Sequence, residues 1–316
     1  MALKVVALAG GVGGAKLADG LAQAMPARDL TIVVNTGDDF DHLGLRICPD
    51  LDTMVYTLAG LADPRRGWGR ADETWHFLEE LGRLGGPVWF RLGDRDLALH
   101  AERTRRLGSG ETLSEVTQHF CQILGVEARV LPMSDQPVET KVMTEDGRMP
   151  FEEYFVARKW KPVVKGFLFE GVEASSPAPG VLQAIQAADL VVLCPSNPWV
   201  SLDPILAVPG IREALHPRPV LGVSPIIGNQ AVKGPAAKMF LEMGMEPTAY
   251  SAAAHFRDLL QGWVIDNQDG HLEERITELG VQVWVSDILM VDDRDRRRLG
   301  AEALRFGAEL RSMEGM

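Results

Sequence analysis

A cluster of glycines near the N-terminus is the first stretch whose residue types could do chemistry. The cluster consists of Gly10, Gly11, Gly13 and Gly14. It follows the apolar residues 5–9 and precedes residues 15–18, which have the composition of a helix. A strand, a glycine turn and a helix together direct backbone N–H groups and the positive end of the helix dipole at a phosphate. The glycines therefore predict a phosphate site, and the alternative is a plain turn between strand and helix.

The standard nucleotide motifs do not fit this turn. Counted from Gly11 and Gly13, the third glycine of a dinucleotide-binding G-x-G-x-x-G would fall on Lys16. A P-loop needs Gly-Lys-Ser/Thr, but Lys16 stands between Ala15 and Leu17. The stretch thus predicts a phosphate site that is neither a standard NAD site nor a standard ATP site.

An acidic loop follows the second predicted strand, at residues 30–34. Within fifteen residues it carries the carboxylates of Asp38, Asp39, Asp41, Asp50 and Asp52. It begins at the carboxyl end of that strand, where open α/β sheets bind their ligands. Carboxylates beside a phosphate cradle suit Mg²⁺, because the metal bridges the two sets of oxygens. We expect a magnesium site here, and the alternative is a solvated loop.

Composition bounds the class of protein. The chain has 316 residues, 46% hydrophobic and 24% charged, with a formal net charge of −12. Such an acidic chain lacks the basic face of a nucleic-acid-coating protein. Its cysteines, Cys48, Cys121 and Cys194, form no C-x-x-C pair, and its histidines show no H-x-x-x-H spacing, so we expect neither a disulfide framework nor zinc. No apolar run reaches the ~18 residues of a membrane span and no signal peptide is recognisable, so the expected location is the cytoplasm.

The elements that must position these residues alternate between strands and helices. Strands are expected at residues 5–9, 30–34, 88–91, 139–144, 163–170, 189–194, 219–223, 263–266 and 281–286. Helices are expected at 51–61, 72–84, 97–107, 112–124, 181–188, 236–243 and 293–310, and turns at 131–137 and 233–235. This alternation predicts an α/β fold with a Rossmann-like three-layer parallel sheet. We expect one domain over 1–316, with a mainly helical insertion at about 50–125.

Seven segments occur together in one order along the chain. They are Gly-Gly-Val-Gly-Gly-Ala-Lys16, Asn-Thr-Gly-Asp-Asp39, Cys-Pro-Asp-Leu-Asp-Thr53, Leu-Gly-Asp-Arg-Asp96, Leu-Pro-Met-Ser-Asp135, Pro-Ser-Asn-Pro198 and Ser-Pro-Ile-Ile-Gly228. In this order they closely resemble the 2-phospho-L-lactate transferase family of deazaflavin coenzyme F-420 biosynthesis. The resemblance extends from about residue 4 to residue 290.

This resemblance implies a Mg²⁺-dependent transferase. A guanosine diphosphate ester of lactate, or of enolpyruvate, donates its phosphoryl group with the acid attached. The acceptor is the ribityl hydroxyl of 7,8-didemethyl-8-hydroxy-5-deazariboflavin, and GMP leaves. The sequence leaves the three-carbon acid, the number of metal ions and the identity of a general base open. The resemblance also implies a homodimer, while the acidic charge and the short apolar runs lead us to expect no nucleic-acid or membrane partner.

The resemblance implies roles for particular residues. The nucleotide and its phosphates are expected to contact Gly11, Val12, Gly13, Gly14, Lys16, Ser196, Asn197, Gly228 and Asn229. Mg²⁺ is expected on Asp38 and Asp39. The deazariboflavin is expected to contact Asp50, Asp52, Arg91 and Arg95. The catalytic set is expected to be Asp38, Asp50, Asp52 and Arg95.

Two other classes of function stay open. One is a non-catalytic nucleotide-sugar-binding regulatory protein of the same superfamily, similar to the gluconeogenesis factors. The block from Pro49 to Asp96 favours the transferase over this class. The other is a nicotinamide oxidoreductase, against which stand the missing third glycine and the lack of an acidic residue at the end of residues 30–34.

Overall fold

The computed structural model describes residues 3–232 and 234–314. Lys233, in the turn expected at 233–235, lies outside the described residues. Among the helices described, none combines the length and the apolar character that crossing a membrane requires.

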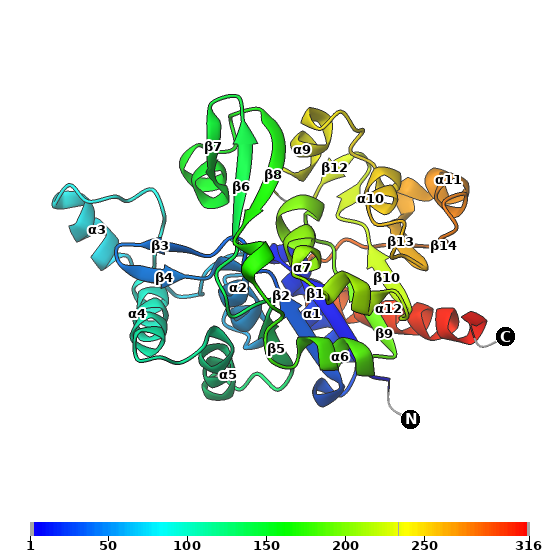
Figure 1. The fold of residues 1–316 in the computed structure, drawn as a ribbon, viewed down its shortest axis with the longest axis horizontal. Coiled ribbons are helices and arrows are strands. Elements are labelled where there is room, and N and C mark those ends of the chain that lie inside the picture. The colour runs from blue at the N-terminus through cyan, green and yellow to red at the C-terminus, as the bar shows by residue number, and fades with distance from the viewer. Residues whose placement is uncertain (1–2, 233, 315–316) are drawn as a thin grey trace.

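A seven-stranded parallel sheet forms the centre of the molecule (Figure 1). Its order is β14 (Gln282–Ser286), β13 (Gly262–Asp266), β10 (Val220–Val223), β9 (Leu190–Leu193), β1 (Val5–Ala9), β2 (Leu30–Val34) and β5 (Arg129–Pro132). The chain runs outward from β1 to β5, then returns to the other side of β1 at β9. The order therefore changes direction between β1 and β9, which is where open α/β sheets form their ligand crevice.

Helices cover both faces of the sheet, because successive strand residues point to opposite sides. Val6 and Leu8 belong to one hydrophobic core, while Val5, Ala7 and Ala9 belong to another. The core of Val6 contains residues of α6 (Val181–Ala187), α7 (Asp203–Ala207), α8 (Ile211–Leu215), α9 (Ala236–Glu242), α10 (Ala249–His255) and α11 (Glu273–Thr277). The core of Val5 contains residues of α1 (Gly11–Ala24), α2 (Pro49–Leu58), α5 (Leu113–Ile123) and α12 (Asp293–Glu314). This is the expected α/β fold with three layers.

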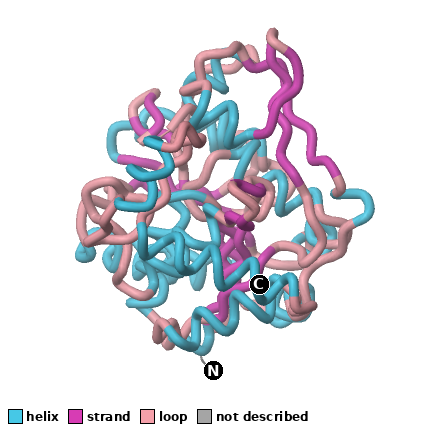
Figure 2. Tube along the Cα trace, turned by 90° about the vertical axis from the view of Figure 1, so that its left-hand side faces the viewer, coloured by secondary structure: helices cyan, strands magenta, loops and turns pink. Residues whose placement is uncertain are grey.

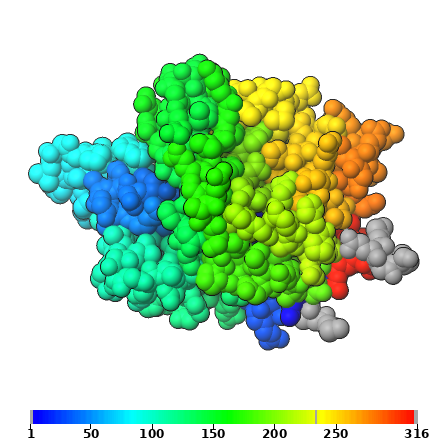
Figure 3. Space-filling model, in the orientation of Figure 1, coloured from blue at the N-terminus to red at the C-terminus, as the bar shows by residue number. Residues whose placement is uncertain are grey.

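Two extensions project beyond these layers. The arm, residues 59–93, carries α3 (His76–Arg83) and reaches outward at the left of Figure 1. The lobe, residues 139–170, is an antiparallel sheet of β7 (Gly147–Pro150), β6 (Glu139–Thr144) and β8 (Val164–Glu170) that rises from the body in Figure 2. Between arm and lobe lies the hairpin of β3 (Phe40–His42) and β4 (Leu45–Ile47), whose surface is visible there in Figure 3. A second hairpin joins β11 (Ile226–Ile227) and β12 (Gln230–Ala231).

The segment expected as a helical insertion is only partly separate from the sheet. Its first and last helices, α2 and α5, bury Leu51, Met54 and Leu113 in the same core as α1. Only α3 and part of α4 (Asp94–Gly108) extend away from that core, and α3 has no buried residue.

Several expected elements differ in the structure. The strand expected at 88–91 is wrong: this segment forms no strand, and Trp89 and Phe90 instead pack their rings against Phe40, at centroid distances of 5.9 and 4.9 Å. Residues 129–132, partly placed in a turn, form the edge strand β5. The helix expected at 72–84 starts later, at His76, because the carboxylate of Asp94 accepts its first backbone N–H groups.

Candidate active site

The glycine turn lies between β1 and β9 where the strand order changes direction, which we call the switch point, and it contacts two other segments. Helix α1 begins at Gly11, four residues before the expected start. The N–H of Gly10 donates to Ser196 Oγ (3.2 Å), and this hydroxyl donates back to the Gly10 carbonyl (2.8 Å). The N–H of Gly11 donates to Asp50 Oδ1 (2.7 Å). The predicted phosphate and acidic segments therefore meet, and both touch the turn after β9.

The glycines of this turn serve two different purposes. A Cβ on Gly13 would lie 2.4 Å from the carbonyl oxygen of Pro195, and one on Gly14 would lie 2.6 Å from Ser196 Oγ. These two glycines let α1 approach the β9 turn closely. Gly11 instead has a φ of +64°, a Cβ there would meet nothing within 4 Å, and the neighbouring Val12 is half-buried. The open space beside the first turn of α1 therefore lies next to Gly11.

Asn35 joins the second strand to this arrangement. Its Nδ2 donates to Asp50 Oδ2 (2.9 Å) and to the carbonyl of Val200 (3.1 Å), and its Oδ1 accepts from the N–H of Gly37 (2.8 Å). Asp50 therefore accepts one hydrogen bond on each oxygen, from the first and second strand ends. These bonds fix its carboxylate at the switch point.

Four buried carboxylates gather here, and we call them the open cluster: Asp38, Asp39, Asp50 and Glu152. Each is only 3 to 7% exposed. Asp38 Oδ1 and both oxygens of Asp39 are buried without a hydrogen-bond partner. The cation nearest to Asp39 is Arg46, at 3.7 Å. Buried acids that lack partners are costly unless a proton or a cation neutralises them.

Burial raises the pKa of every member of the open cluster, and repulsion between members adds to this for Asp38 and Glu152. Burial, and then the charges of Asp50 and Glu152, raise the pKa of Asp38 well above its ordinary value. Burial raises the pKa of Asp39 to about 7, although Arg46 opposes the shift. Burial raises the pKa of Asp50 to about 6, and burial with repulsion from Asp50 and Asp39 raises that of Glu152 to about 8. The site therefore attracts positive charge.

A cleft opens from the open cluster between hairpin and lobe. Its volume is about 540 Å³. The lining residues are Asp39, Phe40, Asp41, Arg46, Trp89, Glu139, Pro150, Glu152, Glu153 and Ala157. Aromatic rings line one wall, where Trp89 lies 5.9 Å from Phe40, and carboxylates line its inner end. The cleft can thus receive a planar group while presenting acids to a polar part of it.

A second set of polar and charged residues, the paired cluster, lies beside the open one, and its aspartates are paired within the protein. It comprises Asp52, Tyr56, Asp96, His100 and Arg103. Arg103 Nη1 donates to Asp52 Oδ2 (3.1 Å), Nη2 pairs with Oδ1, and Arg103 is 3% exposed. Tyr56 donates to Asp96 Oδ1 (2.7 Å), and His100 Nε2 lies 3.3 Å from the same oxygen. Burial would raise the pKa of Asp96, but His100 and Tyr56 together lower it below its ordinary value.

Asp52, expected to face the acceptor, is therefore turned away from the switch point. Asp50 and Asp52 are two residues apart in the first turn of α2, so their side chains leave the helix about 200° apart. Asp50 points to the glycine turn and Asp52 to α4. The structure brings together Gly11, Asp38, Asp39, Asp50 and Ser196 of the predicted residues.

The other predicted nucleotide contacts are more scattered. Asn197 caps the turn that follows it, accepting from the N–H of Trp199 (3.1 Å). The N–H of Gly228 donates to Asp269 (3.1 Å), and Asn229 is exposed with a φ of 64°. Lys16 Nζ donates to the carbonyl of Met290 (2.6 Å), so it would have to leave this oxygen to reach a phosphate.

The two predicted arginines lie on the arm side and are exposed. The guanidinium of Arg91 stacks over the Trp75 ring, 4.4 Å from its centroid. The backbone of Arg95 is held by Glu73, which accepts its N–H (2.8 Å), while its side chain reaches solvent.

Sequence reasoning missed Arg46, His100, Arg103 and Glu152. Asp96, His100 and Arg103 stand at i, i+4 and i+7, so a polar stripe on one face of α4 was readable. Glu152 carried no such signal, because the lobe brings it to the acidic loop from more than 100 residues further along the chain.

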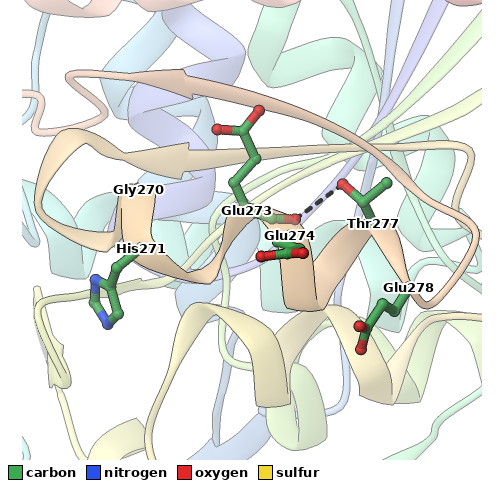
Figure 4. A pocket seen from close by; sticks show the side chains of 6 residues that line it. All are labelled: Gly270, His271, Glu273, Glu274, Thr277 and Glu278. Carbon is green, nitrogen blue, oxygen red and sulfur yellow. Dashed lines mark hydrogen bonds between the residues drawn. The ribbon is translucent and has the colours of Figure 1, made fainter.

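A second hollow, of about 570 Å³, lies on α11 at the β14 edge of the sheet and has no comparable organisation. It is lined by Gly270, His271, Glu273, Glu274, Thr277 and Glu278. Their side chains point in different directions, and the one hydrogen bond drawn in Figure 4 runs from Thr277 Oγ1 to the Glu273 carbonyl (2.9 Å). We therefore place the candidate site at the switch point.

The chain is similar to known proteins over nearly its whole length. The family model of the 2-phospho-L-lactate transferase CofD matches residues 5–305. The chain is 44% identical to a phosphoenolpyruvate transferase of Streptomyces griseus, covering 98% of this chain and 100% of that protein. It is 41% identical to a phosphoenolpyruvate transferase of Thermobifida fusca, covering 98% and 99%. A solved structure of a UPF0052 family member from Bacillus halodurans matches 96% of this chain and 99% of its own with a TM-score of 0.65, at 17% identity, which supports the fold alone.

Proposed function

Because the chain belongs to the 2-phospho-L-lactate transferase CofD family and is a transferase enzyme, we propose that it acts in coenzyme F-420 biosynthesis. The proposed reaction moves a phosphoenolpyruvyl or phospholactyl group from a guanosine diphosphate ester to the ribityl hydroxyl of 7,8-didemethyl-8-hydroxy-5-deazariboflavin and releases GMP. The names of the curated relatives favour the enolpyruvyl donor. The observation that carries the proposal is the hydrogen bond from the Gly11 N–H to Asp50 Oδ1 (2.7 Å), which joins the glycine turn to a group of buried acids.

We assign the donor diphosphate to the space beside Gly11. The first N–H groups of α1 and the helix dipole would stabilise phosphate charge there. Ser196 and Asn197, across the switch point, would contact the nucleotide, with Gly228 and Asn229 extending its site. Because Asp50 accepts the Gly11 N–H in this structure, a phosphate at Gly11 would have to displace or share that bond.

The residues of the open cluster fit Mg²⁺. Asp38 and Asp39 offer hard oxygen ligands that are buried and lack hydrogen-bond partners. Over residues 3–232 and 234–314, no three His, Cys, Asp or Glu side chains converge tightly enough to hold an ion by themselves. Mg²⁺ commonly takes one or two carboxylates and completes its shell with waters and phosphate oxygens, so Asp38 and Asp39 suffice as protein ligands. When bound, Mg²⁺ would neutralise charge on the phosphate oxygens.

We assign the deazariboflavin to the cleft. Phe40 and Trp89 would contact its planar rings, and Arg91 and Arg95 would approach from the arm. Asp50 is better placed than Asp52 to orient the attacking hydroxyl, since Asp52 is occupied by Arg103. In the transfer, the hydroxyl oxygen bonds to the phosphorus that carries the acid, the bond from that phosphorus to the GMP oxygen breaks, and the hydroxyl proton passes to a carboxylate such as Asp50.

The test is a direct assay. The protein is incubated with the deazariboflavin, Mg²⁺ and each candidate guanosine diphosphate ester, and product mass and released GMP are measured by mass spectrometry. We expect one GMP per product molecule, no reaction in EDTA, and a preference for the enolpyruvyl donor. Absence of product with every donor would overturn the proposed substrates. Light scattering would test the expected homodimer.

A further inference from the structure

A buried guanidinium from α4 reaches under the first turn of α2. Arg103 binds Asp52 with two nitrogens, and its Nη1 also lies 3.3 Å from the backbone carbonyl of Arg46 in β4. One side chain thus joins α4, α2 and the hairpin that carries the cleft wall. Arg103 is only 3% exposed, so solvent cannot replace these partners.

The contacts continue from Arg103 along α4 to the arm. His100 Nδ1 lies 3.2 Å from Arg103 Nη1 and 3.5 Å from Asp52 Oδ2. Asp96, next in the paired cluster, has its backbone N–H bound by Glu73 Oε1 (2.8 Å), while the other oxygen of Glu73 accepts the N–H of Arg95. The paired cluster therefore extends from the start of α2 to the backbone that presents Arg95.

Asp50 shares its helical turn with Asp52. Its two hydrogen bonds, from the Gly11 N–H (2.7 Å) and from Asn35 (2.9 Å), depend on the rotation and height of that turn. The Asp52–Arg103 pair constrains both, because two N–H···O contacts to one carboxylate restrict distance and orientation together. Asp50, which faces the switch point, and Asp52, which faces α4, extend from opposite sides of the same helical turn.

We propose that Arg103 is a positioning residue, which acts through Asp52 to hold Asp50 against the glycine turn. The role in transfer rests on the proposed function, whereas the positioning itself does not. A buried ion pair is weak grounds for stability alone, since its desolvation offsets much of its attraction. A lysine at this position would keep the charge but lose the two-pronged geometry.

Hydrogen exchange measures the positioning without any substrate. The exchange rate of the Gly11 amide is followed by NMR in wild-type protein and in Arg103→Gln, Arg103→Lys and Arg106→Gln. Arg106 is the matched control, because it lies on the same helix and pairs with Glu102 and Glu111 instead of α2. We expect exchange to accelerate by about tenfold in Arg103→Gln, by a smaller factor in Arg103→Lys, and by less than about twofold in Arg106→Gln. Equal Gly11 protection in wild type and both Arg103 variants would overturn the proposal.

A double-mutant cycle measures the consequence for transfer. We expect kcat/KM to fall by about 10- to 100-fold in Arg103→Gln and in Asp52→Asn, mainly in kcat, and no further in the double variant than in the worse single one, because the two residues act as one unit. Additive losses, or wild-type kcat/KM in a folded Arg103→Gln, would overturn the proposal. A wild-type enzyme that transfers nothing would instead reject the proposed function, and the Gly11 exchange rates would still decide the positioning role.

Discussion

The open cluster and the paired cluster both contain buried aspartates and lie on either side of one helical turn, yet their electrostatics are opposite. In the paired cluster, Asp52 has Arg103 and Asp96 has Tyr56 and His100. In the open cluster, Asp38 and Asp39 keep oxygens without hydrogen-bond partners, and burial raises their pKa values. The difference teaches that local charge density alone does not mark a site. A site is marked instead by buried carboxylates that have no neutralising partner within the protein.

The largest expected effect is on activity and comes from replacing Asp38 of the open cluster. Asp38→Asn should lower kcat/KM of the transfer by about 10³-fold or more, because it removes a charged ligand of the Mg²⁺ that would neutralise the phosphates. Its melting temperature should equal or exceed that of the metal-free wild type, since a buried repulsive charge is gone. Steady-state kinetics and calorimetry check both parts. The exposed Asp146, replaced by Asn, serves as the control for this substitution.

The next effect is on stability and comes from replacing Arg103 of the paired cluster. Arg103→Gln should lower the free energy of unfolding by about 3 kcal/mol, because it leaves Asp52 buried without its partner. Arg106→Gln, which removes a half-buried pair at the surface of α4, should cost at most about 1 kcal/mol. Urea denaturation measures both. Equal losses in the two variants would mean that the paired cluster is no more than a surface network.

A smaller effect concerns pH and Mg²⁺ together. The pKa values of Asp39, Asp50 and Glu152 are raised to about 7, 6 and 8, so the folded, metal-free protein binds more protons than the unfolded chain between about pH 4 and pH 8. Stability from these groups is present at low pH and is lost as the pH rises through those values. Mg²⁺ should therefore raise the melting temperature more at pH 8 than at pH 5.5, by roughly 2–5 °C.

Calorimetric scans with Mg²⁺ and with EDTA at the two pH values check this difference. A Mg²⁺ effect that is independent of pH would place the ion away from the open cluster. In Asp38→Asn the pH dependence of the Mg²⁺ effect should shrink, which ties it to this site.

The smallest effect probes the ion pair between Asp39 of the open cluster and Arg46 of the β3–β4 hairpin. Arg46 lies 3.7 Å from Asp39 and is about a quarter exposed, so its attraction is partly screened. Arg46→Gln should tighten Mn²⁺ binding by about threefold at pH 8, because a cation that competes for Asp39 is removed. Electron paramagnetic resonance of free Mn²⁺ measures the affinity. Weaker binding in this variant would show that Arg46 organises the site more than it competes with the metal.

Prediction from the sequence succeeded where the signal is local. The parallel strands that follow one another with helices between them, such as 5–9 and 30–34, were readable because their apolar runs are continuous. The strand assigned to 88–91 was wrong because aromatic residues suit a strand and a ring cluster equally, and only contact with Phe40 decides between them. The sequence predicts a turn over part of edge strand β5, since Pro132 and the polar residues 134–136 obscure a strand of four residues.

The sequence by itself determined that a glycine turn and an acidic loop would stand at the carboxyl ends of neighbouring parallel strands. Sheet geometry follows from the strand pattern, and the two segments follow their strands directly. Only the tertiary structure decided which buried carboxylates lack a neutralising partner. That choice depends on partners distant in the sequence, with Arg103 of α4 neutralising Asp52 and Glu152 of the lobe adding charge beside Asp50. Burial and pairing arise from packing, so two aspartates in one helical turn acquire opposite roles.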